Sequence, residues 1–417
     1  MRRILLLLLP FIAASALAQT DIHTTIEAAR AAKLIPIVVP RPDTALPLEA
    51  YNAQFWAPFT RDLTHSGVFA LTPYPPNVPI DATLTQRLNA QFFLLTTLRT
   101  EEQDYVIEVR LIDTTGTTQF GKRYRGTKDA LTRMAHIIAN ELVRSENGKP
   151  SIFLSQLAFA SNRDGNFEIY LMDWDGGSQR RITRHNALSI LPSWAPDNER
   201  MVYTSFFGGT SDMYIISRRG GGRIKLKTGL NLNTSATFSP VGSDIAFVGS
   251  INGNPDIYLI KDDGTNLRRL TSDPSIESTP EWSPNGRQIS FTSGRGGTPQ
   301  IYVMDAEGSN VRRMSFEGDW NDDATWSPGG DEIAYTSRVN GRFQIRIQNA
   351  ATGVSRIVAG EGSNEQPTWS PDGQWLAFQS NRSGTWQIYR MRVDGTDIQQ
   401  LTFDGENKDP DWSKKAE

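Results

Sequence analysis

Residue types that could carry out catalysis are scarce and scattered in this sequence. The histidines are too far apart for a metal-ligand motif, and there are four of them: His23, His65, His136 and His185. There is no cysteine to act as a nucleophile, and no Gly-x-Ser-x-Gly marks an exposed serine on a hydrolase turn. His136 falls off the apolar stripe of its expected helix, so we predict a solvated surface histidine there. The sequence therefore predicts no catalytic site, no metal and no cofactor.

Two short motifs resemble ligand-binding loops, but turns explain them better. Asp173-Trp174-Asp175-Gly176 resembles the start of a calcium loop but lacks the downstream Glu that completes one. Gly220-Gly221-Gly222 lacks the Lys-Ser/Thr pair of a phosphate loop. Both motifs fall where two expected strands need a hairpin turn, so we expect a structural role for each.

The strongest candidate positions precede six regularly spaced aromatic residues, which we call the anchor aromatics. These are Trp194, Phe238, Trp282, Trp326, Trp369 and Trp412. Six residues before them stand Leu188, Leu232, Ile276, Trp320, Ser363 and Glu406. One residue further along stand Ser189, Asn233, Glu277, Asn321, Asn364 and Asn407. Four successive pairs thus combine a large apolar side chain with a polar one.

Two interpretations of these pairs are open. An apolar arc with a polar and acidic rim, made by Asp322, Asp323, Glu361 and Glu365, has the anatomy of a protein-docking patch. Alternatively, the apolar residues pack beneath their own loops and the Asn side chains brace turns.

The spacing of the anchor aromatics indicates the elements that position these residues. A period of roughly 40 to 50 residues with several short strands in each copy is typical of a β-propeller. Most anchors precede a turn such as Ser370-Pro371-Asp372-Gly373, in which Pro suits the second position. Strands such as Leu376–Ser380, Gln387–Arg392 and Gln399–Thr402 follow. Each copy is therefore expected to form a four-stranded antiparallel sheet.

The two ends of the array are expected to close the ring. The unit from Leu157 to Thr183 has strands two to four, and Asp411-Trp412-Ser413 supplies a first strand alone. Together they complete one blade, which removes the free sheet edges. We predict a six-bladed β-propeller over residues 151–417, closed by the C-terminal strand.

The residues before the expected propeller do not follow the repeat pattern. Arg2 and Arg3, the apolar run Ile4–Ala14 and the small residues Ala16-Leu17-Ala18 predict a secretory signal peptide over residues 1–18. No later apolar run approaches the roughly 20 residues that cross a bilayer. We therefore expect an exported protein, and the periplasm suits one of this size without disulfides.

Residues 19–148 are predicted to form an α/β domain. Strands are expected over Ile35–Val39, Gln91–Leu98 and Tyr105–Ile112, and helices over Leu48–Leu63 and Thr127–Arg144. The boundary with the propeller is expected near residues 147–150.

Charge excludes one class of partner. The formal net charge is -3, and no run of five like charges occurs. The sequence therefore has no electrostatic footprint for nucleic acid. As a separate expectation, the protein is a monomer that is peripheral to membranes through its partners.

An exported chain with an α/β domain and six blades of this kind resembles the TolB family of the Tol-Pal envelope system. The resemblance runs from Ile35-Pro36-Ile37-Val38-Val39-Pro40 to Asp409-Pro410-Asp411-Trp412-Ser413. It implies a non-catalytic periplasmic adaptor whose propeller mouth binds Pal, a peptidoglycan-associated lipoprotein, and which bacteriocins exploit. It also implies a role in outer-membrane invagination during cell division.

The resemblance also implies contact residues. The family's Pal contacts carry over onto Leu232, Ser235 and Ser278, and by extension onto the neighbouring loop residues, including Asn364 and Glu365. The family's extreme N-terminus contacts the inner-membrane protein TolA. Here that segment contains Thr20, Asp21, Ile22, Thr24 and Ile26 and lacks the expected strand-like alternation.

The alternative function is a propeller-bearing enzyme. A peptidase of this kind needs a C-terminal hydrolase domain, and the chain ends five residues after Trp412. A polysaccharide lyase needs a His-rich metal cluster, and His185 is the only histidine of the expected propeller. We therefore expect an adaptor.

Overall fold

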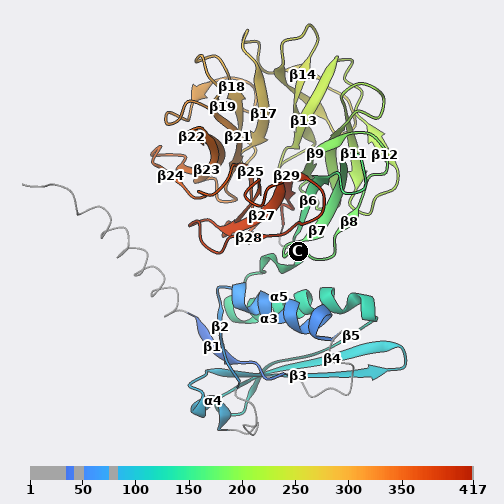
Figure 1. Cartoon of the computed structure of the whole chain (residues 1–417), viewed down its shortest axis with the longest axis vertical. Coiled ribbons are helices and arrows are strands. Elements are labelled where there is room, and N and C mark those ends of the chain that lie inside the picture. Colours follow the sequence, from blue (N-terminus) through green and yellow to red (C-terminus); the bar gives the residue numbers. More distant parts are fainter. Residues whose placement is uncertain (1–33, 42–50, 75–82, 416–417) are drawn as a thin grey trace, which may run out of the picture. The chain divides into compact units, whose positions relative to one another are not determined.

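A computed structural model describes residues 34–41, 51–74 and 83–415 of the 417-residue chain. The chain divides into two compact units, Met1–Ser151 and Ile152–Glu417, which are an α/β domain and an all-β propeller (Figure 1). The predicted signal peptide and the predicted TolA-contact residues lie outside the described residues. Among the helices that are described, none combines the length and the apolar character that a bilayer crossing requires.

The N-terminal unit contains one mixed five-stranded sheet. Its strands, in spatial order, are β2 (Phe69–Thr72), β1 (Ile35–Val38), β3 (Phe92–Glu101), β4 (Asp104–Asp113) and β5 (Thr118–Gly126). β1 pairs in parallel with both β2 and β3, whereas β3, β4 and β5 form antiparallel pairs. The sequence prediction missed β2 and β5. β5 is an edge strand whose residues are all exposed or half-buried, so it lacks the apolar signal of a buried strand.

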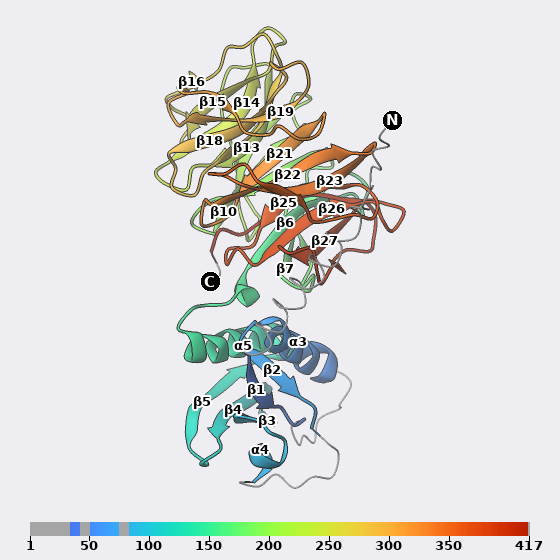
Figure 2. The ribbon, with the colours of Figure 1, turned by 90° about the vertical axis from the view of Figure 1, so that its left-hand side faces the viewer.

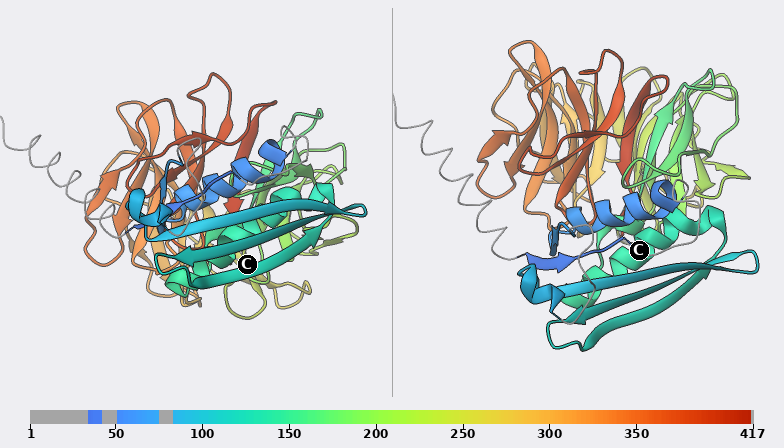
Figure 3. Two further views of the ribbon diagram at one scale, coloured as in Figure 1. Left: turned by 90° about the horizontal axis from the view of Figure 1, so that it is seen from below. Right: turned by 60° about the horizontal axis from the view of Figure 1, so that its bottom comes forward.

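The helices α3 and α5 cover one face of this sheet (Figures 2 and 3). The helical segments of the unit are η1 (Asn52–Trp56), α3 (Ala57–His65), α4 (Leu84–Arg87), η2 (Lys128–Ala130) and α5 (Leu131–Asn147). α5 buries Leu131, Met134, Ile138 and Leu142 at helical spacing. It ends at Gly148, whose φ of 72° is left-handed and whose N–H donates to Arg144 O at 2.9 Å.

His136 corrects one sequence prediction. Its side chain is only 2% exposed, and its Nδ1 lies 2.7 Å from Asp62 Oδ2 on α3. The prediction of a solvated surface histidine was wrong, because α3 packs against α5 and buries the polar flank of α5 as well as its apolar stripe.

The second unit begins with the short helix η3 (Ile152–Leu154) and continues as six four-stranded antiparallel sheets. Each blade is given from its innermost strand outward. Blade 1 contains β29 (Asn407–Trp412), β6 (Gln156–Ser161), β7 (Glu168–Asp173) and β8 (Arg180–Arg181). Blade 2 contains β9 (Ser189–Trp194), β10 (Arg200–Ser205), β11 (Asp212–Ser217) and β12 (Arg223–Lys225). Blade 3 contains β13 (Leu232–Phe238), β14 (Asp244–Ser250), β15 (Asp256–Lys261) and β16 (Arg268–Arg269).

The remaining blades repeat this plan. Blade 4 contains β17 (Glu277–Trp282), β18 (Gln288–Ser293), β19 (Gln300–Asp305) and β20 (Arg312–Arg313). Blade 5 contains β21 (Asn321–Trp326), β22 (Glu332–Val339), β23 (Arg342–Asn349) and β24 (Ser355–Ile357). Blade 6 contains β25 (Asn364–Trp369), β26 (Trp375–Ser380), β27 (Gln387–Arg392) and β28 (Gln399–Gln400).

The predicted closure of the ring is confirmed. β29, the last strand of the chain, pairs antiparallel with β6, with Asn407 opposite Ser161 and Trp412 opposite Leu157. Apolar clusters join neighbouring blades, as where Trp194 packs with Leu171 of blade 1 and Tyr203 of its own blade. The fold is therefore the predicted two-domain arrangement of an α/β domain and a six-bladed propeller.

Candidate partner-binding site at the channel mouth

The innermost strand of every blade is irregular at the same place. The residue three positions before the anchor aromatic has a φ between 45° and 55° in all six blades, at Leu191, Ser235, Thr279, Asp323, Gln366 and Asp409. The pairing with the second strand shifts register at this point. A left-handed φ is strained for a residue with a side chain, and a bulge bends the strand that carries it. Because the bulge recurs at the same position in all six blades, it is a regular part of the channel wall.

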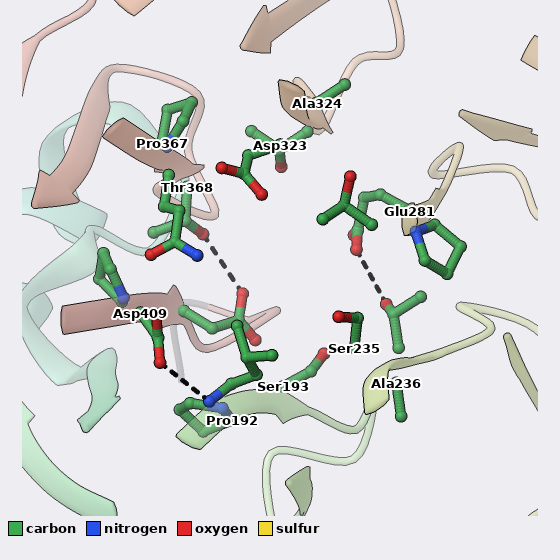
Figure 4. Close-up of a pocket in the computed structure, with 18 residues that line it drawn as sticks. Pro192, Ser193, Ser235, Ala236, Glu281, Asp323, Ala324, Pro367, Thr368 and Asp409 are labelled. Atoms are coloured by element: carbon green, nitrogen blue, oxygen red, sulfur yellow. Dashed lines mark hydrogen bonds between the residues drawn. The ribbon is translucent and has the colours of Figure 1, made fainter. Parts of the chain in front are cut away.

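These bulges line a cavity in the central channel. The bulge residue and the next two residues of each inner strand surround a volume of about 130 Å³. Figure 4 shows Glu281, Asp323 and Asp409 around this cavity, with Pro192, Pro367 and the other lining residues between them. The channel wall therefore combines small, rigid residues with a few carboxylates.

The carboxylates give the channel an acidic character. Burial raises the pKa of Asp323 well above its ordinary value, and the nearby carboxylates of Asp322, Asp409 and Glu365 raise it further. Burial also raises the pKa of Asp409, although the N–H of Leu191 donates to its Oδ2 at 3.1 Å and opposes the shift. Burial likewise raises the pKa of Glu281, against the charge of Lys414. The negative charges crowd one another, so a cationic or hydrogen-bond-donating group would be favoured here.

Aromatic and proline side chains gather at the other end of the inner strands. A cavity of about 220 Å³ is lined there by Trp194, Phe238, Trp282, Trp326, Trp369 and by five prolines of the following turns. Lys414 occupies the position of the sixth proline, and its Nζ lies 3.1 Å from Asp411 Oδ1. This end therefore has a wall of aromatic and proline side chains to which Glu281 and Lys414 add charged groups.

The predicted apolar arc lies on the loops that cross from one blade to the next, but its members are not equally exposed. Ile276 is 65% exposed and Trp320 is 36% exposed. Trp320 contacts the Phe343 ring at a centroid distance of 6.3 Å, and the Arg338 guanidinium carbon lies 5.8 Å from its ring. Leu188 is partly exposed, whereas Leu232 is half-buried and packs against the apolar cluster between blades 3 and 4. Ile276 is therefore the most accessible member.

The polar member of each predicted pair is buried. Ser189, Asn233, Glu277, Asn321, Asn364 and Asn407 all lie beneath the crossing loops. Asn321 Nδ2 donates to Gln300 Oε1 at 2.8 Å and to Glu317 O at 2.9 Å, and Asn364 and Asn407 donate to Gln344 and Gln387 in the same way. Glu277 accepts a hydrogen bond from Arg295. The bracing interpretation therefore describes these six side chains, which hold the loops rather than face a partner.

Four further predicted residues lie on the inner strands near the channel opening, and all are half-buried: Ser235, Ser278, Asp322 and Glu365. Asp322 Oδ1 accepts hydrogen bonds from Thr279 Oγ1 at 3.0 Å, from Thr292 Oγ1 at 2.6 Å and from the Asp323 N–H at 2.9 Å. Glu365 Oε2 accepts one from Gln379 at 3.3 Å. The structure thus brings Asp322, Asp323 and Glu365 of the predicted acidic rim together near the channel. Glu361, the fourth predicted member, is exposed on the crossing loop between β24 and β25.

The sequence reasoning missed two exposed aromatics on the same loops. Phe316 and Phe403 are strongly exposed, and each directly follows a fully buried hydroxyl residue, Ser315 or Thr402. These hydroxyls donate to Gln300 and Gln387, so they occupy equivalent positions in blades 4 and 6. Aligning the repeats on this hydroxyl, rather than on the anchor aromatic, would have found both phenylalanines.

Comparison with known proteins decides the family. A family model described as the TolB beta propeller domain matches residues 153–237, 222–359 and 351–417, together more than half of the chain. The chain belongs to the TolB family. The Tol-Pal system protein TolB of Syntrophotalea carbinolica is 33% identical over 221 residues, which cover 48% of this chain and 50% of that protein. A TolB homolog of Chlorobium chlorochromatii is 32% identical over 157 residues, covering 35% of this chain and 36% of that protein. The match therefore spans at most half the length of these two relatives.

A solved TolB structure extends the likeness to both units. The crystal structure of TolB from Acinetobacter baumannii has a TM-score of 0.77 at 24% identity, and it covers 91% of this chain and 96% of that one. At this identity the likeness shows a shared fold. The Syntrophotalea carbinolica relative is named for the Tol-Pal system and the Chlorobium chlorochromatii relative only as a TolB homolog. Neither is named for a reaction, which agrees with the prediction of a non-catalytic protein.

Proposed function

We propose that this TolB-family protein is a periplasmic adaptor of the Tol-Pal system. In this proposal the crossing-loop face of the propeller binds a Pal-type peptidoglycan-associated lipoprotein, and the segment around residues 19–27 binds TolA. The adaptor then links outer-membrane and inner-membrane partners, supports outer-membrane invagination during cell division, and is open to capture by bacteriocins.

The observation that carries the proposal is the exposed apolar surface around the acidic channel opening. Ile276, Leu188 and Trp320 expose apolar side chains on crossing loops of one face, and Phe316 and Phe403 add aromatic surface to those loops. Exposed large apolar groups beside polar and acidic ones are the usual composition of a protein interface.

The channel adds a chemical requirement for the partner. A group that enters between Asp323 and Asp409 meets carboxyls whose pKa values are raised, so it relieves their repulsion only if it is cationic or donates hydrogen bonds. The partner surface is therefore expected to place such a group, flanked by apolar residues, opposite the channel.

A titration with a purified, lipid-free Pal-type lipoprotein tests the propeller half of the proposal. Ile276→Asp puts a charge where the partner buries an apolar group, and we expect at least a tenfold rise in Kd, which is about 1.4 kcal/mol. Ile224→Asp is the matched control, because Ile224 is 64% exposed against 65% for Ile276 and lies on the outer strand of blade 2. Equal affinities for both variants would reject this face as the lipoprotein site.

A separate experiment tests the N-terminal half. Removing residues 19–27 is expected to abolish cross-linking to TolA while the melting temperature and the lipoprotein affinity stay unchanged, because a segment that orders only on its partner does not support the fold. Undiminished cross-linking by the shortened protein would overturn the TolA assignment for this chain.

A further inference from the structure

The hairpin between the third and fourth strands has an unusual charge in one blade. The residue before its glycine is acidic in blades 1, 3, 4 and 6, where it is Asp175, Asp263, Glu307 or Asp394. In blade 2 the same position is Arg219, preceded by Arg218, and in blade 5 it is the neutral Thr352. Because all six hairpins serve the same turn, the reversed charge in blade 2 is not a requirement of the fold.

Cations continue from this hairpin along the outer strand of the blade. No Asp or Glu occurs between Met213 and Ser243, whereas five cations do: Arg218, Arg219, Arg223, Lys225 and Lys227. Blade 1 extends the same surface. Arg180 on β8 donates from Nη2 to Arg218 O at 2.7 Å, and Arg223 Nη1 lies 3.1 Å from His185 Nδ1, next to Arg184. We call these seven Arg and Lys residues the basic edge; β8 and β12, which carry three of them, lie at the right of the ring in Figure 1.

Few carboxylates neutralise the basic edge. Arg218 pairs with Glu199 at 2.9 Å, and Lys225 pairs with Asp212 at 2.6 Å. Arg184, Arg219 and Lys227 are exposed and form no ion pair with any residue that the structure describes. Several charges are therefore available to an external anion.

Exposed apolar groups lie among these cations. Ile224, between Arg223 and Lys225, is 64% exposed. Phe207 is also exposed, and the Arg223 guanidinium carbon lies 4.3 Å from its ring centroid. Cations around exposed apolar side chains are the composition of a surface that binds anionic membranes, where phosphates meet the charges and the apolar groups enter the interface.

We propose that the basic edge docks directly on an anionic phospholipid surface. The basic edge follows the outermost strand of blade 2 and the segments on either side of it, and five of its seven cations are exposed, which suits a broad surface of headgroups. An acidic protein segment is the less favoured occupant, because β12 has only three residues and offers little backbone for an added strand. The basic edge adjoins the lipoprotein site, because Arg184 and Leu188 lie on the same crossing loop, between β8 and β9. The proposal rests on the cations and not on the apolar arc, so it stands independently of the lipoprotein proposal.

Vesicle flotation tests the proposal with vesicles of phosphatidylglycerol and phosphatidylethanolamine, and with phosphatidylcholine vesicles as the neutral arm. We expect binding to the anionic vesicles only, with a loss at high salt. A cation near such a surface contributes about 1 kcal/mol, or about fivefold in affinity, so Arg219→Ser with Lys227→Ser should weaken binding roughly 30-fold. Arg268→Ser with Arg287→Ser removes two exposed cations elsewhere on the ring and should leave binding within about twofold.

Three results would overturn the proposal. The first is binding to neutral vesicles that equals binding to anionic vesicles, and the second is an equal loss of vesicle binding in both double variants. The third is a protein that does not bind vesicles but retains a polyglutamate peptide, which would assign the basic edge to an acidic protein. Ile224→Ser should weaken vesicle binding and leave lipoprotein affinity unchanged, and Ile276→Ser should do the reverse. A melting temperature equal to that of the parent protein shows that each variant is folded.

Discussion

The indole Nε1 of Trp412 donates a hydrogen bond to Ser155 Oγ at 2.8 Å, although the two residues are 257 positions apart in the chain. Ser413 continues the connection, since its N–H donates to Gln156 O at 2.9 Å and its Oγ accepts from the Gln156 N–H at 3.1 Å. Trp412 itself is fully buried. The ring is therefore closed by specific side-chain contacts as well as by the pairing of β29 with β6.

Deleting residues 409–417 should destroy the propeller. The deletion removes most of β29, including Trp412, and so leaves β6 without its inner partner and exposes an unpaired edge. We expect aggregated or rapidly degraded protein on expression. A shortened protein that stays monomeric in size-exclusion chromatography and melts cooperatively would contradict the closure mechanism.

Much of the propeller was predictable because its signals are local and repeated. The turn after Trp369 is set by Pro371 and Gly373, and the strand that follows it, β26, has a run of apolar residues that are buried in the structure. The same pattern recurs at a fixed period, so the blade count followed from the spacing. β5 carried no such signal, because an edge strand needs few apolar residues.

The binding site was less predictable, because exposure depends on contacts between loops. Asn321 and Ile276 occupy neighbouring positions in the repeat, yet one is buried against Gln300 and the other is exposed. His136 shows the same limit in the N-terminal unit. Its partner Asp62 lies 74 residues away on another helix, so helical periodicity in α5 alone does not reveal the pair.

Replacing Trp320 should affect both folding and binding. About a third of this side chain is exposed, and the rest contacts Phe343 and Arg338. We expect Trp320→Ala to lower the free energy of unfolding by about 1 to 2 kcal/mol and the lipoprotein binding free energy by a similar amount. Ile276→Ala should lower only the binding free energy. Thermal melts and calorimetric titrations of both variants check this, and a change confined to stability in Trp320→Ala would make it a packing residue.

The buried pair of His136 and Asp62 should be important for the stability of the N-terminal unit. His136→Ala takes the imidazole from a fully buried carboxyl 2.7 Å away, and loss of one partner of a buried pair costs about 3 to 5 kcal/mol. Arg133→Ala, on the exposed face of the same helix, should change stability by less than about 0.5 kcal/mol. Circular dichroism melts and amide hydrogen exchange of α5 measure the difference; similar melts for the two variants would show that the pair contributes little.

Asp323 should make the propeller less stable as the pH rises. Burial and the neighbouring carboxylates of Asp322, Asp409 and Glu365 raise its pKa in the folded protein above that of the unfolded chain. The folded state therefore binds the proton more tightly, so stability falls as the pH rises from the unfolded pKa, about 4, through the raised folded value.

Asp323→Asn keeps the shape of the side chain and removes its charge. We expect the variant to unfold about 2 to 4 °C higher at pH 8, which is roughly 1 kcal/mol for a domain of this size, and the difference to shrink towards zero near pH 4. Asp319→Asn is the control, because Arg338 lowers the pKa of that exposed carboxyl and neutralisation there should not raise the melting temperature. If the melting temperature of Asp323→Asn at pH 8 is equal to or below that of the parent protein, the crowded channel carboxylates do not destabilise the folded propeller.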